Sequence, residues 1–379
     1  MNYSYKTFFQ NLYRQQGQRY AFCARDEKEA AGWQREFRAA LEEKLGIRLL
    51  REIQTKPGRD GSGSFRCETA LLEEVQEDGY RRRKYVMNTL PEVYMPFYML
   101  IPDGTEEETL ARAMIAVPAH GANKNTVCRV GETPEERAKI QAAPAECYGR
   151  EFVKRGYVVF CPDPPGYGER TEPIPREDPG FLTGKKKNSL ESSCKDLAQT
   201  AEALGLSLTG LEVWDLMRLL DFACQSPEVR KEDGCALIGC AGFSGGGQYA
   251  MWLAALDERI RMAVVSGYVH GYYDSMLECH LCPCNYAPNL WRLGDISDIC
   301  SLIAPRPLFV ENGTRDVENG PCGIDGPKKQ VEKIRQAYAL FGAQEKLYHF
   351  TPEGEHRWYG GCYAFAEQYL AGTDSGYKI

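Results

Sequence analysis

The chain has 379 residues, 43% of them hydrophobic and 26% charged, which is enough apolar material for one large core beneath an ordinary water-exposed surface. The formal net charge of −7 argues against a surface that binds polyanions, so we expect no nucleic-acid partner. Two short basic runs, residues 81–84 and 185–187, are interpreted as solvated edges or loops.

The N-terminal residues do not show the basic start and apolar segment of a signal peptide, and no apolar run is long enough to span a bilayer. Fifteen cysteines, an odd number scattered along the chain, are typical of thiols in a reducing compartment rather than of a disulfide framework. We therefore expect a cytoplasmic protein with no membrane partner.

The first part of the chain, residues 3–56, has a helical pattern, in which Trp33, Phe37, Leu41 and Leu45 recur at helical spacing. A glycine-rich loop is expected at residues 57–63, followed by strands near residues 68–77, 85–88 and 94–101. We therefore divide the chain into an N-terminal helical extension, residues 1–63, and a larger α/β domain, residues 64–379.

Beyond residue 102 short apolar runs alternate with amphipathic helices. The runs are residues 113–118, 157–161, 235–241, 262–266, 307–311 and 346–350, and the clearest helices are 210–224, 246–256 and 327–341. Buried parallel strands read as continuous apolar runs, with crossover helices on both faces of their sheet. The pattern predicts a doubly wound, mostly parallel sheet, whose active site would lie at the carboxyl ends of its strands.

A candidate nucleophile follows one of these runs. Residues 242–246 read Gly-Phe-Ser-Gly-Gly, a G-x-S-x-G motif between a predicted strand and a predicted helix. Such a turn strains the serine backbone, lifts the hydroxyl above the sheet and points the helix N-terminus at a developing oxyanion. No Lys-Ser or Lys-Thr follows the glycines, which disfavours a phosphate-binding loop. Ser244 is therefore the predicted nucleophile.

The general base and the acid are expected after Ser244, in the order Ser, acid, His. His356 lies in a loop just beyond the last predicted strand, where the base belongs, whereas His349 is interpreted as a strand residue. Asp316 follows the preceding strand and is the predicted acid; Glu311 comes too early, and Glu318 is its closest rival. The acid would hold the imidazole tautomer and stabilise its charged form.

The oxyanion hole is expected to combine the N–H groups of Gly245 and Ala122, because one donor follows the nucleophile and the other comes from the loop after an earlier strand. In that loop Gly121 would allow a close approach and His120 would brace the backbone. Candidates for substrate contact are His120, Gly121, Phe243, Glu169 and His280, with a structural ion pair as the alternative for Glu169.

These motifs resemble the α/β-hydrolases of the bacterial acetyl-xylan-esterase-like group, which is related to dienelactone hydrolases. The resemblance covers the chain from about Tyr94 to the C-terminus. Beyond the three predicted catalytic residues it rests on residues 162–170, 210–218 and 298–307. It implies a cofactor-free serine esterase that removes a short acyl group from a small or carbohydrate-type alcohol. Members are often secreted, whereas this sequence shows no leader, so we expect the substrate to be an imported, short acylated molecule rather than a polysaccharide.

Residues 279–284, Cys-His-Leu-Cys-Pro-Cys, are the one segment whose composition suggests a metal. Their spacing matches no standard zinc pattern and no second cysteine pair is obvious, so we interpret them as a pocket-rim loop with packed thiols and expect no metal. The alternatives to an esterase are a prolyl-oligopeptidase-like peptidase, an acyltransferase with the same triad, or a non-catalytic scaffold. The oligomeric state stays open; an N-terminal helical arm would suit a homo-oligomer contact.

Overall fold

The computed structural model describes residues 3–55, 65–105, 109–172 and 193–370. The predicted loop at 57–63, the domain boundary at 63/64 and the basic run at 185–187 lie outside these residues. Across the described part of the chain, no helix combines the length and the apolar character needed to cross a membrane.

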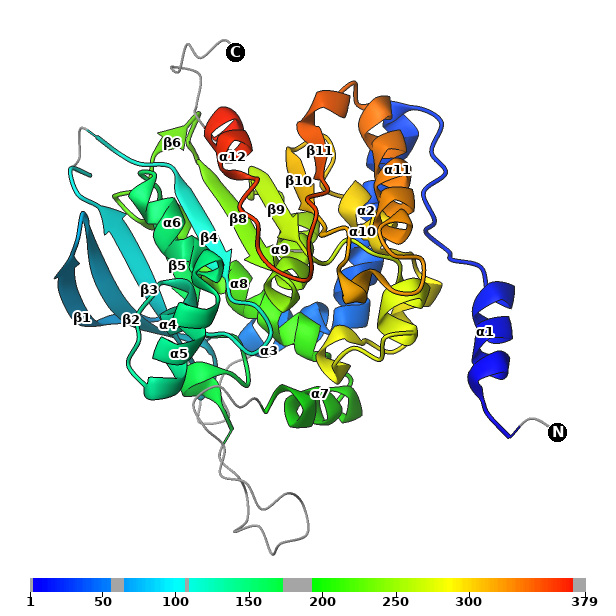
Figure 1. Cartoon of the computed structure of the whole chain (residues 1–379), viewed down its shortest axis with the longest axis horizontal. Helices are drawn as coiled ribbons and strands as arrows, with labels where there is room; N and C mark the ends of the chain where they lie inside the picture. The colour runs from blue at the N-terminus through cyan, green and yellow to red at the C-terminus, as the bar shows by residue number, and fades with distance from the viewer. Residues whose placement is uncertain (1–2, 56–64, 106–108, 173–192, 371–379) are drawn as a thin grey trace, which may run out of the picture.

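One nine-stranded sheet organises the described residues, and it confirms the predicted doubly wound, mostly parallel arrangement (Figure 1). In spatial order its strands are β1 (Thr69–Glu77), β2 (Tyr80–Leu90), β3 (Val93–Pro102), β5 (Val158–Pro162), β4 (Ala113–Val117), β8 (Ile238–Phe243), β9 (Met262–Ser266), β10 (Leu308–Glu311) and β11 (Leu347–Phe350). The strands from β5 to β11 are parallel, and β1, β2 and β3 extend the sheet as an antiparallel edge.

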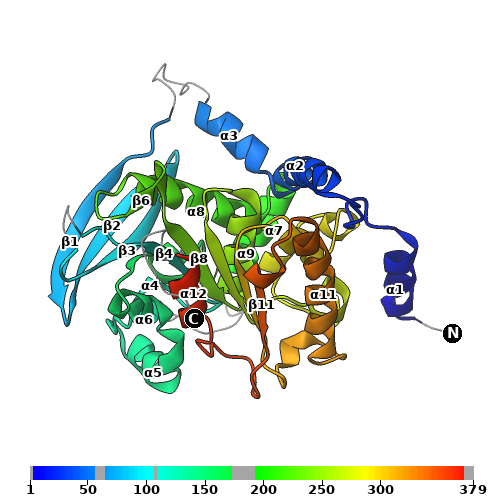
Figure 2. The same cartoon turned by 90° about the horizontal axis from the view of Figure 1, so that it is seen from above.

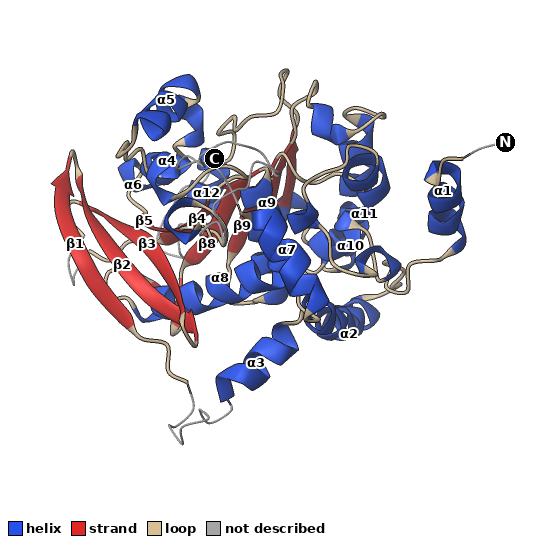
Figure 3. Ribbon diagram, turned by 90° about the horizontal axis from the view of Figure 1, so that it is seen from below, coloured by secondary structure: helices blue, strands red, loops and turns tan. Residues whose placement is uncertain are grey.

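Helices cover both faces of this sheet (Figure 2). One face carries α2 (Glu27–Leu45), α3 (Ile47–Thr55), α8 (Leu208–Gln225), α9 (Gly245–Leu256), α10 (Ile296–Ser301) and α11 (Asp325–Leu340). The other carries α4 (Lys124–Val127), α5 (Pro134–Ala142), α6 (Tyr148–Lys154) and α12 (Tyr363–Tyr369). α7 (Cys194–Ala203) lies beside α8. α1 (Lys6–Gln15) lies at the periphery (Figure 3), where Tyr13 packs on Tyr273 and Trp291 and Lys6 pairs with Glu278 of the segment after β9.

The N-terminal helices contribute to the main core. Phe37, Leu41 and Leu45, predicted to share one helix face, are fully buried in the same cluster as the β8, β9 and α8 side chains. Helix α2 begins at an Asp26 cap and ends at Gly46, whose φ of +81° favours glycine. In contrast, α1 buries none of its residues.

Two sequence expectations need adjustment. The predicted strand over 235–241 is divided, because Cys235–Ala236 pairs with Lys231–Glu232 in a separate small hairpin, β6 and β7, and β8 begins at Ile238. The basic run at 81–84 lies on β2, where Arg82 forms ion pairs with Glu73 and Glu77 of the neighbouring strand. Of the two interpretations, the run therefore lies at the sheet edge and not in a loop, but Arg82 is held by ion pairs rather than solvated.

Candidate active site

Ser244 occupies a strained turn between β8 and α9. Its φ of 54° and ψ of −121° lie in a region that residues other than glycine rarely adopt, and its N–H donates to the carbonyl of Ser266 at 2.8 Å. The neighbouring glycines are required by close approach: a Cβ on Gly246 would lie 2.1 Å from the carbonyl oxygen of Val117. The turn therefore has the geometry that the sequence motif predicted.

Three predicted side chains meet at the carboxyl edge of the sheet. His356, in the loop after β11, places Nε2 2.9 Å from the Oγ of Ser244 and Nδ1 2.7 Å from Oδ2 of Asp316. Asp316 follows β10 and is almost fully buried, and its other oxygen accepts the N–H of Glu318 at 2.8 Å. This arrangement can deprotonate the hydroxyl and stabilise the resulting imidazolium.

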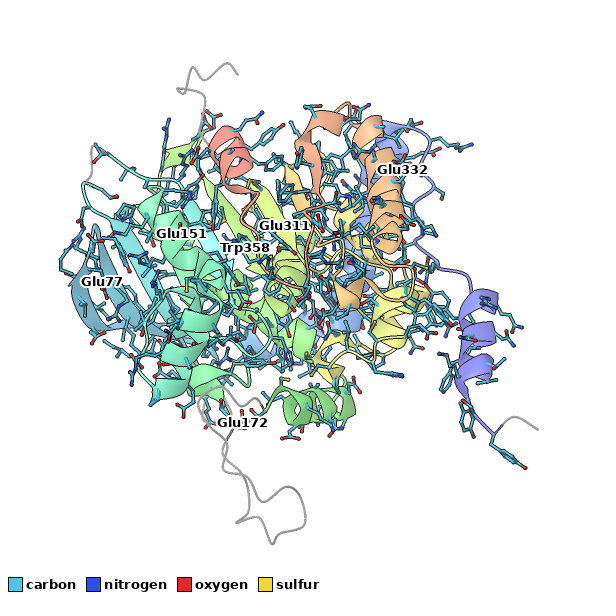
Figure 4. All side chains as sticks on the ribbon, in the orientation of Figure 1. Glu77, Glu151, Glu172, Glu311, Glu332 and Trp358 are labelled. Atoms are coloured by element: carbon cyan, nitrogen blue, oxygen red, sulfur yellow. The ribbon has the colours of Figure 1, made fainter. Side chains whose placement is uncertain are left out.

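The loop that carries His356 is held by Glu311, at the end of β10. One oxygen of this buried carboxylate accepts from the Ser266 hydroxyl at 2.7 Å and from the N–H of Tyr359 at 3.0 Å; the other accepts from the N–H of Gly361 at 3.1 Å. Glu311 and Trp358 are labelled near the centre of Figure 4. Although Glu311 is not the acid, it fixes the loop just after Trp358, at Tyr359 and Gly361.

Charges around His356 favour its protonated form. Burial lowers the pKa of the imidazole, but the hydrogen bond to Asp316 and the nearby charges of Glu318 and Glu146 outweigh burial and raise the pKa above its usual 6.5. Glu318 lies 3.6 Å from Nε2, on the serine side of the ring. Burial raises the pKa of the Glu318 carboxyl, an effect that the charge of His356 opposes.

The backbone N–H groups of the two predicted oxyanion donors, Gly245 and Ala122, differ in their hydrogen bonding. Gly245 begins α9, where the first N–H groups have no partner within the helix. The N–H of Ala122, by contrast, donates to the carbonyl of Ala119 at 2.8 Å, so the prediction of Ala122 as a donor conflicts with the turn at 119–122. The backbone of His120 lies against Gly245: a Cβ on Gly245 would be 3.0 Å from His120 N. Among the described residues, the backbone N–H of His120 donates no hydrogen bond.

A cavity of about 480 Å³ opens over Ser244 and His356, a size typical of sites for small molecules. Three of the predicted substrate contacts line it, namely His120, Phe243 and His280. The other lining residues are Ala119, Lys139, Glu146, Tyr268, Leu281, Cys282, Asn285 and Glu318, of which Leu281 and Cys282 belong to the segment predicted to form the pocket rim. Lys139 of α5 and Glu146 of η1 (Pro144–Glu146) come from segments that carry no recognisable motif.

The remaining two predicted contacts, Gly121 and Glu169, do not line this cavity. Gly121 has φ +76°, and a Cβ there would meet nothing nearer than Lys139 Nζ at 3.9 Å, so the turn conformation rather than close approach requires glycine. Glu169 forms ion pairs with Lys84 and with Lys124. It therefore has the structural role that was its alternative interpretation.

A buried ion pair supports the loop after β4. Lys124 Nζ lies 2.8 Å from Oδ2 of Asp163, and both side chains are almost completely excluded from solvent. Asp163 also accepts the N–H of Lys124 at 2.9 Å and that of Glu169 at 3.0 Å. The pair therefore joins the loop containing His120 to the segment after β5.

Four side chains that could hold a metal gather at one edge of the cavity: His120, Cys194, Cys282 and Cys284. Two of them belong to the segment at 279–284, whereas His120 and Cys194 come from distant parts of the sequence.

Comparison with known proteins agrees with this architecture. The family model described as "Abhydrolase family" matches residues 3–273. A protein of Bacillus subtilis (strain 168) named "Putative hydrolase YtaP" is 28% identical over 212 residues, which cover 52% of this chain. The alignment spans 58% of that relative, less than two thirds of its length.

Solved structures share the fold. A Bacteroides fragilis protein described as "a putative acetyl xylan esterase" has a TM-score of 0.70 at 22% identity, covering 93% of this chain and 83% of that one. A glucuronoyl esterase from Solibacter usitatus has a TM-score of 0.62 at 14% identity, covering 94% and 96%. These similarities confirm the predicted α/β-hydrolase fold.

Proposed function

The chain belongs to the abhydrolase family, and from this premise we propose that it is a serine esterase that hydrolyses small carboxylic esters through an acyl-enzyme. The observation that carries the proposal is the continuous hydrogen-bonded chain from the Oγ of Ser244 through both nitrogens of His356 to the carboxylate of Asp316. A hydroxyl is a weak nucleophile at neutral pH, and this arrangement supplies the base that it needs.

In the proposed reaction the Oγ of Ser244 attacks the ester carbonyl while its proton passes to Nε2 of His356. The carbonyl oxygen becomes an oxyanion, which the N–H groups of Gly245 and His120 would stabilise. His356 then protonates the alcohol oxygen as the carbon–oxygen bond breaks, leaving an acyl group on Ser244. Water, deprotonated by His356, hydrolyses this ester and restores the free serine. Asp316 keeps Nδ1 protonated and stabilises the imidazolium throughout.

The cavity supports a polar alcohol and a short acyl group. Lys139, Glu146, His280, Asn285 and Glu318 contribute polar groups to its lining, suited to hydroxyls rather than to a long alkyl chain. Of the structural neighbours named above, one is described as "a putative acetyl xylan esterase", a name for an enzyme that removes a short acyl group from a carbohydrate alcohol. We therefore propose a short acyl ester of a small or carbohydrate-type alcohol. The fifteen cysteines favour a reducing compartment, and the cytoplasm is the proposed location.

The test compares wild-type protein with Ser244→Ala on p-nitrophenyl acetate and acetylated sugars. We expect the substitution to abolish hydrolysis while circular dichroism and the thermal midpoint stay close to wild type. Undiminished turnover in the variant would contradict the proposal. Aminoacyl-proline amides and added alcohol acceptors, run in parallel, distinguish an esterase from a peptidase and from an acyltransferase.

A further inference from the structure

Three segments bring sulfur and imidazole ligands to one point beside the cavity. His120 comes from the loop after β4, Cys194 is the first residue of α7, and Cys282 and Cys284 flank Pro283 at the start of η4 (Pro283–Asn285). One potential ligand atom from each side chain lies within 4.8 Å of all the others. Cys194 therefore contacts His120, which is 74 positions away in the chain, and Cys282, which is 88 positions away. Sequence spacing does not reveal these contacts.

We propose that His120, Cys194, Cys282 and Cys284 bind one thiophilic divalent cation, Zn²⁺ in the cell, through the imidazole Nε2 and three Sγ atoms. A tetrahedral zinc ion with bonds of about 2.0–2.3 Å sets neighbouring ligand atoms about 3.6–3.8 Å apart. The Nε2 of His120 lies 3.5 Å from the Sγ of Cys194, which in turn lies 3.3 Å from the Sγ of Cys282. If these two distances between ligand atoms increased by a few tenths of an ångström, the ion would fit between them.

The surroundings of the sulfur atoms suit thiolates. The Tyr167 hydroxyl donates to the Sγ of Cys194 at 3.1 Å, and Nδ2 of Asn285 donates to the Sγ of Cys284 at 3.5 Å. Such donors around metal-bound sulfur orient the ligands and stabilise their negative charge. Cys194 and Cys284 are buried, so thiolate charge there needs a cation.

Two simpler explanations account for less of this cluster. Packed thiols would not require an imidazole nitrogen at 3.5 Å or donors directed at two of the sulfurs. A disulfide between Cys194 and Cys282 would use two of the four groups and leave His120 and Cys284 without a role. One ion engages all four.

The ion would have a structural role, because four protein ligands complete a tetrahedral site and leave no position for a reacting water. It would link the loop after β4, the start of α7 and the loop after β9. Since the backbone of His120 lies against Gly245, the ion would also fix the N–H that we propose as an oxyanion donor. The metal site itself stands independently of the proposed function.

The experiment measures metal in the full-length protein, expressed in zinc-supplemented medium and purified without chelator or metal-affinity tag. We expect about one zinc per chain by plasma mass spectrometry, and background zinc in Cys284→Ser and Cys282→Ser. Cys279→Ser is the matched control, because it lies in the same loop but its Sγ contacts the carbonyl of Val317 instead of the cluster. It should retain the full zinc content.

Cobalt substitution of the wild-type protein gives a second measurement, which does not depend on the variants folding. Co²⁺ bound here should show thiolate-to-cobalt charge-transfer absorption and the intense visible bands of tetrahedral coordination. The proposal is overturned if neither ion binds stoichiometrically after reconstitution, or if Cys284→Ser retains as much zinc as wild type. Peptide mapping that finds a Cys194–Cys282 disulfide in metal-free native protein would overturn it as well.

Discussion

Replacing Gly245 by alanine tests the position of the oxyanion donors. The new Cβ would lie 3.0 Å from both the N and the Cβ of His120 and 3.3 Å from its Cα, closer than ordinary van der Waals contact. Because two of these three atoms belong to the backbone, the loop must retreat by a few tenths of an ångström. That retreat lengthens the hydrogen bond from the N–H of His120 to the oxyanion, and hydrogen bonds weaken as they lengthen.

The size of the effect follows from the value of one oxyanion donor. Removing such a donor costs about 10²–10³-fold in kcat, or about 2.7–4 kcal/mol, so we expect Gly245→Ala to lower kcat by about 10²-fold. KM should change little, since the interaction strengthens in the transition state. Alanine is favourable in a helix, so α9 should stay folded.

The assay is steady-state hydrolysis of p-nitrophenyl acetate, with the thermal midpoint measured on the same samples. Gly32→Ala is the matched control, because Gly32 lies within helix α2 and its Cβ would meet nothing nearer than Arg35 at 3.8 Å. It should hydrolyse the ester at the wild-type rate. A Gly245→Ala enzyme with wild-type kcat would refute the placement of the donors.

Three further predictions concern the base, its acid and the loop support. Asp316→Asn should lower kcat by about 10⁴-fold with little loss of stability, because the amide favours the wrong tautomer of His356; stopped-time ester assays measure it. The raised pKa of His356 means that kcat/KM should fall as pH drops through an inflection above 6.5, and Glu318→Gln should move that inflection to lower pH in a pH–rate profile. Lys124→Met leaves the Asp163 carboxylate buried without its cation and should lower the free energy of unfolding by about 3–5 kcal/mol in urea titrations.

Controls for these predictions use exposed groups. Asp325→Asn removes a carboxylate that is largely exposed and, within the described part of the chain, pairs with Lys328 alone, so activity should be unchanged. Lys154→Met removes the partner of Asp78, whose side chain is 92% exposed, and should cost no more than about 1 kcal/mol. An inflection at or below pH 6.5, or a Lys124→Met protein as stable as Lys154→Met, would contradict the electrostatic reasoning.

The positions of Ser244, Asp316 and His356 could be predicted because each follows a parallel strand of the sheet. The carboxyl ends of those strands meet at one edge, so the strand order brings the three loops together. The local glycine pattern also predicted the strained turn, since close approach leaves no room for side chains there.

Other features depend on three-dimensional detail that spacing does not encode. Whether Ala122 or His120 faces the oxyanion is decided by one turn, in which the N–H of Ala122 is taken by Ala119. Lys139 of α5 and Glu146 of η1 line the cavity, which no motif signals. Sequence spacing also does not show that the four proposed metal ligands form one cluster, because three separate segments of the chain bring them together.

The most direct test of the central claim is covalent labelling by a fluorophosphonate, followed by intact-mass and peptide mass spectrometry. An activated serine at this site predicts one adduct per chain, on the peptide that contains Ser244, with concurrent loss of esterase activity. His356→Ala should label far more slowly. Protein that hydrolyses esters yet carries no adduct at Ser244, or carries its adduct at another serine, would contradict the account.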